Sequence, residues 1–137
     1  MRIIATSVAV VLLVVLAVVP GIAGGDPKAG EGTFDELLAL ARRDIATKKG
    51  APYDTLIGQQ FSTKYAKAVA DCVEAAGNEL PEPFKAVVVI AKNGKVTAIS
   101  LSRQDEVTQC IGKLLLREVF PKPPFAPFHD LMEIFFY

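Results

Sequence analysis

The sequence is poor in the residues that most often carry catalysis and metal binding. Among 137 residues it has one histidine, His129, and two cysteines, Cys72 and Cys110. A protein metal site needs three or four converging ligands, and these residues give no recognisable set. The cysteines are also too far apart for a Cys-x-x-Cys redox motif. We therefore expect no metal and no cofactor.

Motifs for phosphate binding and for hydrolysis are missing as well. The glycine-rich stretch 24–32 follows no strand and lacks the lysine spacing of a phosphate-binding loop. His129 stands next to Asp130, and such a pair can orient a base for a nucleophile, but a polar start to an edge strand explains it equally simply. Glu79 and Glu82 lie in a proline-bounded loop, where solvated carboxylates are expected. We predict no catalytic residues and a protein that is not an enzyme.

An excess of charge of either sign is also absent. Lys and Arg number 15, and Asp and Glu number 15. A nucleic-acid-binding surface needs clustered basic residues, so the balance argues against a nucleic-acid partner. It argues equally against a membrane surface bound through charge.

The N-terminus has the features of a secretory signal peptide. Arg2 precedes an almost wholly apolar run, residues 3–19, and Pro20-Gly21 interrupts it before small residues that permit cleavage after Ala23. The alternative is an uncleaved anchor, because about 20 apolar residues can cross a bilayer. We expect residues 1–23 to be a signal peptide, with no membrane span after cleavage, residues 24–32 to be a flexible linker, and residues 33–137 to be a single domain.

In an exported chain the two cysteines predict one disulfide bond, Cys72–Cys110. Both lie on the apolar sides of predicted helices, so these helices should pack side by side on one face of a sheet. Two buried free thiols are the alternative.

Two helices are predicted in the first half of the domain. Thr33 and Glu36 form a capping box for a helix over residues 33–49. Residues 51–58, which include a proline, are expected to be a connection. A second helix is predicted over residues 60–76.

The strongest local signal is a β-hairpin over residues 84–101, with Asn93-Gly94 as a two-residue turn. This turn predicts three pairs on one face: Ala86 with Leu101, Val88 with Ile99 and Ile90 with Thr97. The opposite face is also apolar, with Val87, Val89, Ala91, Val96 and Ala98. We expect the first helix, a second copy or a partner to cover it.

A third helix and a last strand follow the hairpin. Ser102 and Asp105 predict the start of a helix that runs to about Glu118, and residues 129–137 predict a strand. A right-handed connection places this strand beside the first one. The predicted fold is α+β, in the order α-α-β-β-α-β: a two-layer domain whose three-stranded antiparallel or mixed sheet has the order 2-1-3 and carries helices on one face.

Aromatic residues crowd the last eighteen positions. About half of them should belong to the core, and the others can line an exposed strand edge that accepts an extended peptide. The last strand has no Lys or Pro to protect such an edge. The candidate partner-binding residues are Leu131, Met132, Glu133, Ile134, Phe135 and Phe136.

The order of motifs in residues 61–137 resembles the TonB-like C-terminal domain, with the AgmX/PglI C-terminal group as the closest variant. The matching residues are Cys72, Asn93-Gly94-Lys95-Val96, Cys110-Ile111, Phe120-Pro121-Lys122-Pro123 and Ile134-Phe135-Phe136. The resemblance implies a periplasmic domain of a Gram-negative envelope whose terminal strand meets partner proteins. In energy-transducing members of this family a long linker precedes the domain. This chain departs from them, because a linker of residues 24–32 spans at most roughly 30 Å and could not reach across a periplasm.

These observations lead to one main hypothesis and two others. The main hypothesis is a periplasmic or secreted adaptor that binds another envelope or periplasmic protein by strand addition; a homodimer stays open. The second is a secreted inhibitor or immunity-type protein that blocks an enzyme with the loop Lys92–Lys95. The third is an enzyme that uses His129 and Asp130.

Overall fold

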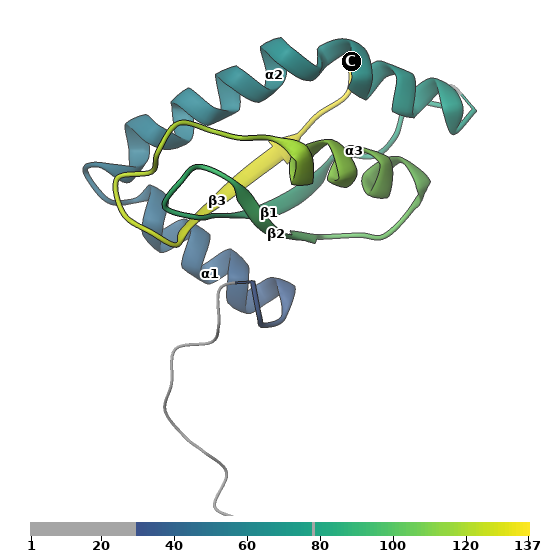
Figure 1. The fold of residues 1–137 in the computed structure, drawn as a ribbon. Helices are drawn as coiled ribbons and strands as arrows, with labels where there is room; N and C mark the ends of the chain where they lie inside the picture. Colours follow the sequence, from purple (N-terminus) through teal and green to yellow (C-terminus); the bar gives the residue numbers. More distant parts are fainter. Residues whose placement is uncertain (1–29, 78) are drawn as a thin grey trace, which may run out of the picture.

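Three helices and three strands make up the part of the chain that the computed structural model describes, residues 30–77 and 79–137 (Figure 1). The elements are α1 (Phe34–Ile45), α2 (Gly50–Ala75), β1 (Phe84–Ile90), β2 (Val96–Leu101), α3 (Glu106–Arg117) and β3 (Phe128–Ile134). The predicted order of helices and strands is confirmed. The expected signal peptide, residues 1–23, and residues 24–29 of the expected linker lie outside the described residues.

The strands form one sheet in the order β2-β1-β3. The central strand β1 is antiparallel to both of its neighbours. The predicted α+β class and the strand order 2-1-3 are therefore confirmed. β3 forms one edge of this sheet, so a further strand could pair with its outer side.

The turn of the hairpin differs from the predicted two-residue turn. The first two predicted pairs are present: Ala86 with Leu101 and Val88 with Ile99. A bulge then shifts the register, so Ile90 pairs with Val96 and not with Thr97. The N–H of Gly94 donates to the Ala91 carbonyl at 2.8 Å, and Gly94 takes a φ of +86°. The extra residue of this bulge is Thr97, which lies between Val96 and Ala98, the partners of Ile90 and Val89. The turn itself spans Ala91 to Gly94.

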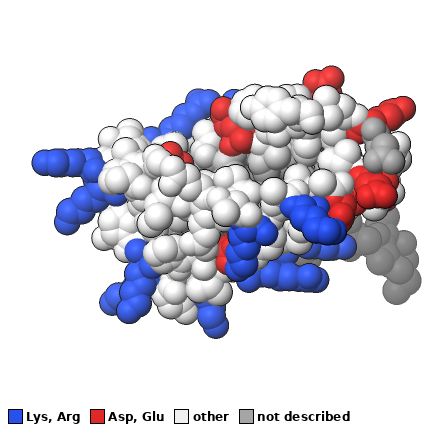
Figure 2. All heavy atoms as spheres, turned by 90° about the horizontal axis from the view of Figure 1, so that it is seen from above, with Lys and Arg blue, Asp and Glu red and all other residues white. Residues whose placement is uncertain are grey.

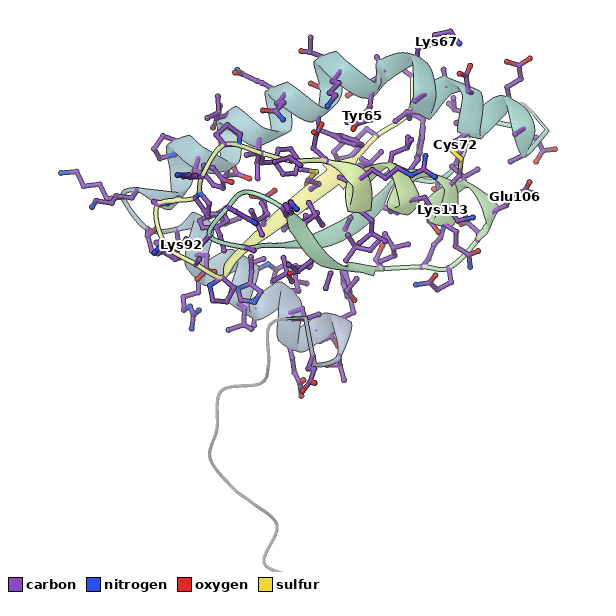
Figure 3. The ribbon with its side chains drawn as sticks, in the orientation of Figure 1. Tyr65, Lys67, Cys72, Lys92, Glu106 and Lys113 are labelled. Atoms are coloured by element: carbon purple, nitrogen blue, oxygen red, sulfur yellow. A yellow bond between two sulfur atoms is a disulfide. The ribbon has the colours of Figure 1, made fainter. Side chains whose placement is uncertain are left out.

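The face of the sheet that carries Ala86, Val88 and Ile90 is covered by α2 and α3. The expected disulfide joins these helices: Cys72 and Cys110 are bonded, with their Cα atoms 5.8 Å apart. Figure 3 shows Cys72 on the inner side of α2, whereas Lys67 points away from the sheet. The two cysteine-bearing helices therefore lie side by side, as predicted.

The opposite face of the sheet is covered by α1. Leu37 and Ala41 of α1 pack against Val87 of β1 in a second apolar cluster, with Leu131 at its margin. The helices thus occupy both faces, and the prediction of two layers with helices on one face is wrong (Figure 1). The bulge also moves Val96 from the predicted second face into the core under α2 and α3.

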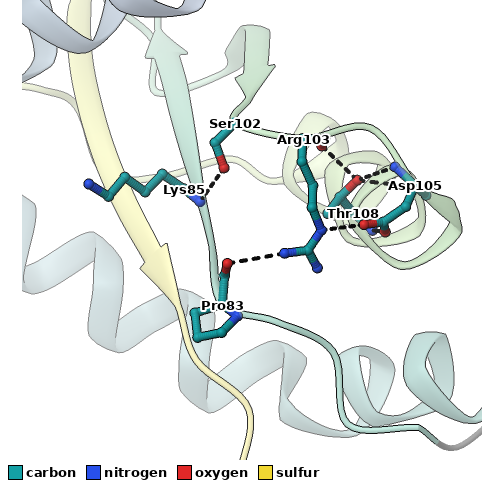
Figure 4. A network of polar contacts seen from close by, with 6 residues as sticks. All are labelled: Pro83, Lys85, Ser102, Arg103, Asp105 and Thr108. Carbon is teal, nitrogen blue, oxygen red and sulfur yellow. Dashed lines mark hydrogen bonds and ion pairs between the residues drawn. The ribbon is translucent and has the colours of Figure 1, made fainter.

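Helix α1 begins as predicted, but α3 does not. Thr33 and Glu36 form the expected capping box of α1. At α3 the cap is Asp105 with Thr108, so the predicted pairing of Ser102 with Asp105 is wrong. Ser102 instead accepts a hydrogen bond from the Lys85 N–H at 2.9 Å and closes the open end of the hairpin (Figure 4).

Helix α2 is ten residues longer at its start than predicted, because it begins at Gly50. Pro52 lies in its first turn, where a proline costs no helical hydrogen bond. The added turns bring Tyr53 and Ile57 into the core. The expected connection over residues 51–58 is thus helical, and α2 extends along the length of β3 (Figure 1).

Candidate functional site

The outer edge of β3 presents backbone groups that no strand pairs with. In an antiparallel sheet, successive residues of a strand turn their N–H and C=O alternately to one side and the other. The His129 N–H donates to Asp44 Oδ2 of α1 at 3.0 Å, so it points away from β1. By alternation the backbone groups of Leu131 and Glu133 point outward too, and no hydrogen bond among the described residues occupies them.

The pairing of β1 gives the same result independently. Lys85 turns both its N–H and its C=O toward Ser102, on the side of β2. Lys85 is also the partner of Glu133 across the β1–β3 ladder. The backbone of Glu133 therefore has no partner in β1 and faces outward.

The six predicted partner-binding residues fall into three groups. Leu131 and Glu133 have the outward backbone groups just described. Met132 and Ile134 turn their side chains into the core cluster under α2. Phe135 and Phe136 lie beyond the end of β3, because the predicted strand over 129–137 ends at Ile134. Phe136 stacks on Phe84 with ring centroids 6.2 Å apart, whereas Phe135 is exposed.

A groove of about 890 Å³ runs between β3 and α2. One wall is the chain from Asp130 to Tyr137, so all six predicted residues line it. The other wall is α2, whose aromatic contribution comes from Phe61 and Tyr65. Figure 3 shows Tyr65 on the side of α2 that faces the sheet. The outward backbone of β3 thus opens into a groove with a largely apolar lining.

The α2 wall of this groove contains a row of small residues. Gly58, Ser62, Ala66 and Ala70 follow one another at intervals of four and therefore share one side of the helix. All four are exposed, and a β-carbon added at Gly58 would meet no atom within 4 Å. An extended backbone can therefore approach α2 closely along this row.

Two carboxyl groups lie at the end of the groove where α2 begins. Asp130 of β3 is 1% exposed, and neither of its oxygens has a hydrogen-bond partner among the described residues. Asp54 lies in the first turns of α2 and lines the same groove. Burial, and secondly the nearby Asp54 carboxyl, raise the pKa of Asp130 to about 9. At neutral pH Asp130 is therefore a protonated, uncharged acid.

His129 and Asp130 do not form the pair that the sequence places side by side. Adjacent residues of a strand point to opposite faces of a sheet. His129 points to the α1 face, where its Nδ1 lies 2.9 Å from Asp44 Oδ2, and both side chains are buried. Asp130 points to the α2 face. The His129–Asp44 contact holds the end of α1 against β3, which is a structural role.

The hairpin turn, the candidate site of an inhibitor, lies at the positively charged end of the molecule. Lys and Arg project there, near the start of α2, and Asp and Glu gather at the opposite end (Figure 2). Lys92 is exposed and points outward from the turn (Figure 3). The Phe120 N–H donates to the Gly94 carbonyl at 2.9 Å and fixes the turn against the following segment.

Sequence reasoning missed the α2 wall of the groove. Residues 51–58 were expected to be a connection, so Asp54 and Gly58 had no predicted place beside β3. The signal that was present is the apolar spacing of Tyr53, Ile57 and Phe61, which continues the helical face backward from residue 60. Pro52 obscured it, although a proline suits the first turn of a helix.

Three further findings bear on the setting of this site. The Cys72–Cys110 disulfide fits an oxidising compartment outside the cytoplasm. Within residues 30–77 and 79–137, no helix is long and apolar enough to cross a bilayer. The same residues hold no group of three or more His, Cys, Asp or Glu side chains placed to bind a metal ion.

Comparison of the chain with models of protein families, with curated proteins and with solved structures found no match.

Proposed function

We propose that this protein is a non-enzymatic binding module of the TonB-like kind, which acts in the periplasm or outside the cell and takes up an extended segment of another envelope protein. The segment would add to the sheet as a fourth strand beside β3. The observation that carries this proposal is the outward backbone of Leu131 and Glu133, which opens directly into the groove along α2.

The groove offers both parts of a strand-addition site. Backbone hydrogen bonds to the β3 edge supply affinity, and pockets for alternate side chains supply specificity. Met132 and Ile134 give the groove an apolar floor, and the small residues of α2 leave room for a chain. Edge strands are commonly protected by Lys, Pro or a covering segment. In β3 the exposed charged side chain is that of Glu133, and its carboxylate pairs with Lys85 at 3.6 Å.

The proposal is tested by a proline at an outward position of β3. Glu133→Pro removes an N–H that makes no bond within the described structure, so the variant should fold and lose partner capture from an envelope extract. Glu133→Gln is the matched control, because it removes the same charge and keeps the N–H. Met132→Pro is a poorer test, since Met132 bonds to β1 by the same alternation and the variant would disturb the sheet.

The outcome is read from captured protein and from the folding of each variant. We expect Glu133→Gln to capture as much as the wild type and Glu133→Pro to capture far less, with unchanged circular dichroism. Equal capture by a folded Glu133→Pro variant would overturn strand addition. A second copy of the chain as the occupant would appear as a dimer in light scattering that Glu133→Pro converts to monomer.

A further inference from the structure

The carboxyl group of Asp130 is almost fully buried beside the Asp54 carboxyl, and it makes no well-formed hydrogen bond to any described residue. Its exposure is 1%, and both of its oxygens lack hydrogen bonds. Buried polar atoms nearly always have a partner, so such an exception calls for an explanation. Asp130 lines the groove, as does Asp54. The unpaired group therefore faces the space that the proposed partner segment would enter.

We infer that the partner segment carries a lysine or arginine side chain that lies in the groove next to Asp130 and Asp54, and apolar side chains that lie next to Met132 and Ile134. This inference rests on the proposed strand addition and specifies which sequence the added strand must have.

The register of an added strand gives the spacing. Residues directly opposite each other on neighbouring strands point to the same face of a sheet, with Cβ atoms about 4.5–5.5 Å apart. A residue opposite Asp130 would thus point toward α2, and residues two and four positions further along would meet Met132 and Ile134. The segment therefore reads basic-x-apolar-x-apolar in one direction of the chain or the other.

A cationic side chain is the occupant that can satisfy both carboxyl groups at this end of the groove once Asp130 has released its proton. Ionised carboxylates only accept hydrogen bonds, whereas ammonium and guanidinium groups only donate them, and such charge-assisted bonds are strong. None of the described residues that line the groove is Lys or Arg. An apolar side chain at this position would leave the Asp130 oxygens without a partner.

The pH dependence of binding follows from the groups around Asp130. From α2 it faces Asp54 and Tyr53, and across the ladder it pairs with the apolar Val88 of β1. The Asp44 carboxylate of α1 lies on the other face of the sheet, bound to His129. Because the free protein holds a proton on Asp130, binding of a cation releases it, and affinity should rise between pH 6 and pH 9.

The experiment measures binding of two fluorescein-labelled, end-capped heptapeptides to the full chain by anisotropy. The first has the sequence Thr-Lys-Thr-Val-Thr-Ile-Thr and the second has norleucine in place of lysine, which keeps the stem and removes the charge. Both are also made in reversed order. The protein variants are Asp130→Asn, Glu133→Pro and, as control, Asp71→Asn, which makes the same chemical change at an exposed residue of α2 that does not line the groove.

At pH 8 we expect the lysine peptide to bind about ten- to a hundredfold more tightly than the norleucine peptide, as for a hydrogen-bonded charge pair. Asp130→Asn should remove this difference and its pH dependence, and Asp71→Asn should keep both. Equal binding of the two peptides, or a lysine preference that survives in Asp130→Asn, overturns the inference.

The design separates this inference from the proposed function. If both peptides bind the wild type equally and Glu133→Pro weakens both, strand addition stands and the cation site is wrong. If Glu133→Pro leaves binding of the lysine peptide unchanged, the proposed function is wrong, and the register on which the inference depends falls with it. If neither peptide binds the wild type in either order, both proposals are overturned.

Discussion

At the scale of single residues, Asp130 is the most unusual group in the described structure. It places an ionisable side chain on the α2 face of β3, between the buried Phe128 and Met132. Burial without a hydrogen bond is costly for the charged form, so the carboxyl keeps its proton far above the ordinary range. A carboxyl group kept neutral in this way can release its proton when a cationic side chain binds next to it.

The first prediction concerns the stability of Asp130→Asn as a function of pH. The pKa of Asp130 is about 9 in the folded protein, against an ordinary value of about 3.9 in an unfolded chain. Between these values the folded state holds a proton that the unfolded state has lost, so the free energy of unfolding falls as pH rises. The free energy of unfolding of Asp130→Asn should not fall in this way. At pH 8 it should exceed that of the wild type by an amount on the order of a few kcal/mol.

Urea unfolding at pH 4, 6 and 8 measures this difference. At pH 4 the two proteins should differ least in stability, because about half of the unfolded chains then still carry the proton on this carboxyl. Glu133→Gln is the control, since it neutralises an exposed carboxylate of the same strand. Parallel pH curves for the wild type and Asp130→Asn would contradict the prediction.

Two glycines should respond in opposite ways to alanine. Gly58 lies inside α2 with open space around it, so Gly58→Ala should raise the free energy of unfolding by about 0.5–1 kcal/mol through helix propensity. At Gly94 the φ is +86° and a β-carbon would lie 1.9 Å from the Phe120 carbonyl oxygen, so Gly94→Ala should destabilise by more than about 1 kcal/mol. Thermal unfolding of the two variants checks the signs, and an equal effect at both sites would refute this account.

At the scale of elements, the groove exists because α2 and β3 run side by side without meeting closely. α3 and the disulfide hold α2 from the other side, through Cys72 and Cys110. The position of the α2 wall relative to β3 thus depends on a covalent link that lies outside the groove. The hairpin supplies the template, since β1 binds β3 along its whole length.

The second element-scale feature with a measurable consequence is this disulfide. Reduction should lower the free energy of unfolding by about 2–5 kcal/mol, because the bond restricts the unfolded chain. The measurement is urea unfolding with and without a reducing phosphine. The double variant Cys72→Ala/Cys110→Ala should be as weak as the reduced protein and insensitive to the phosphine, and an unchanged midpoint on reduction would show the prediction to be wrong.

At the scale of the whole molecule, three layers replace the two that the sequence predicts. α1 closes the second face of the sheet through Leu37 and Ala41, and Asp44 at its end binds the His129 N–H. With both faces covered, the outer edge of β3 is the open part of the sheet next to the groove. A further strand can therefore reach the sheet at the outer edge of β3.

Removal of one side chain should test whether α1 is an integral layer. Leu37 is 3% exposed, and Leu37→Ala should lower the free energy of unfolding by about 2–4 kcal/mol. Leu116 of α3 is 46% exposed, so Leu116→Ala should change it by less than about 0.5 kcal/mol. If Leu37→Ala behaves like the Leu116 control, α1 contributes no stability to the fold.

The sequence by itself determined the features that depend on local spacing. Helical and alternating periodicities predicted the order of elements and the inward positions of Cys72 and Cys110, and the capping box at Thr33 predicted the start of α1. The strand order followed from the right-handed connection between the second and third strands. Of the six candidate partner-binding residues, Leu131 to Ile134 lie in the edge strand β3, whereas Phe135 and Phe136 lie beyond its end.

Only the tertiary structure decided the features that depend on distant contacts. The bulge at Thr97, the early start of α2 and the placement of α1 on the second face each depend on what packs against the segment. His129 and Asp130 are neighbours in the sequence, but their side chains lie on opposite faces of the sheet. His129 contacts Asp44 of α1, and Asp130 lies beside Asp54 of α2. The groove and its unpaired acid arise where the fold brings α2 and β3 side by side, although 53 positions separate the end of α2 at Ala75 from the start of β3 at Phe128.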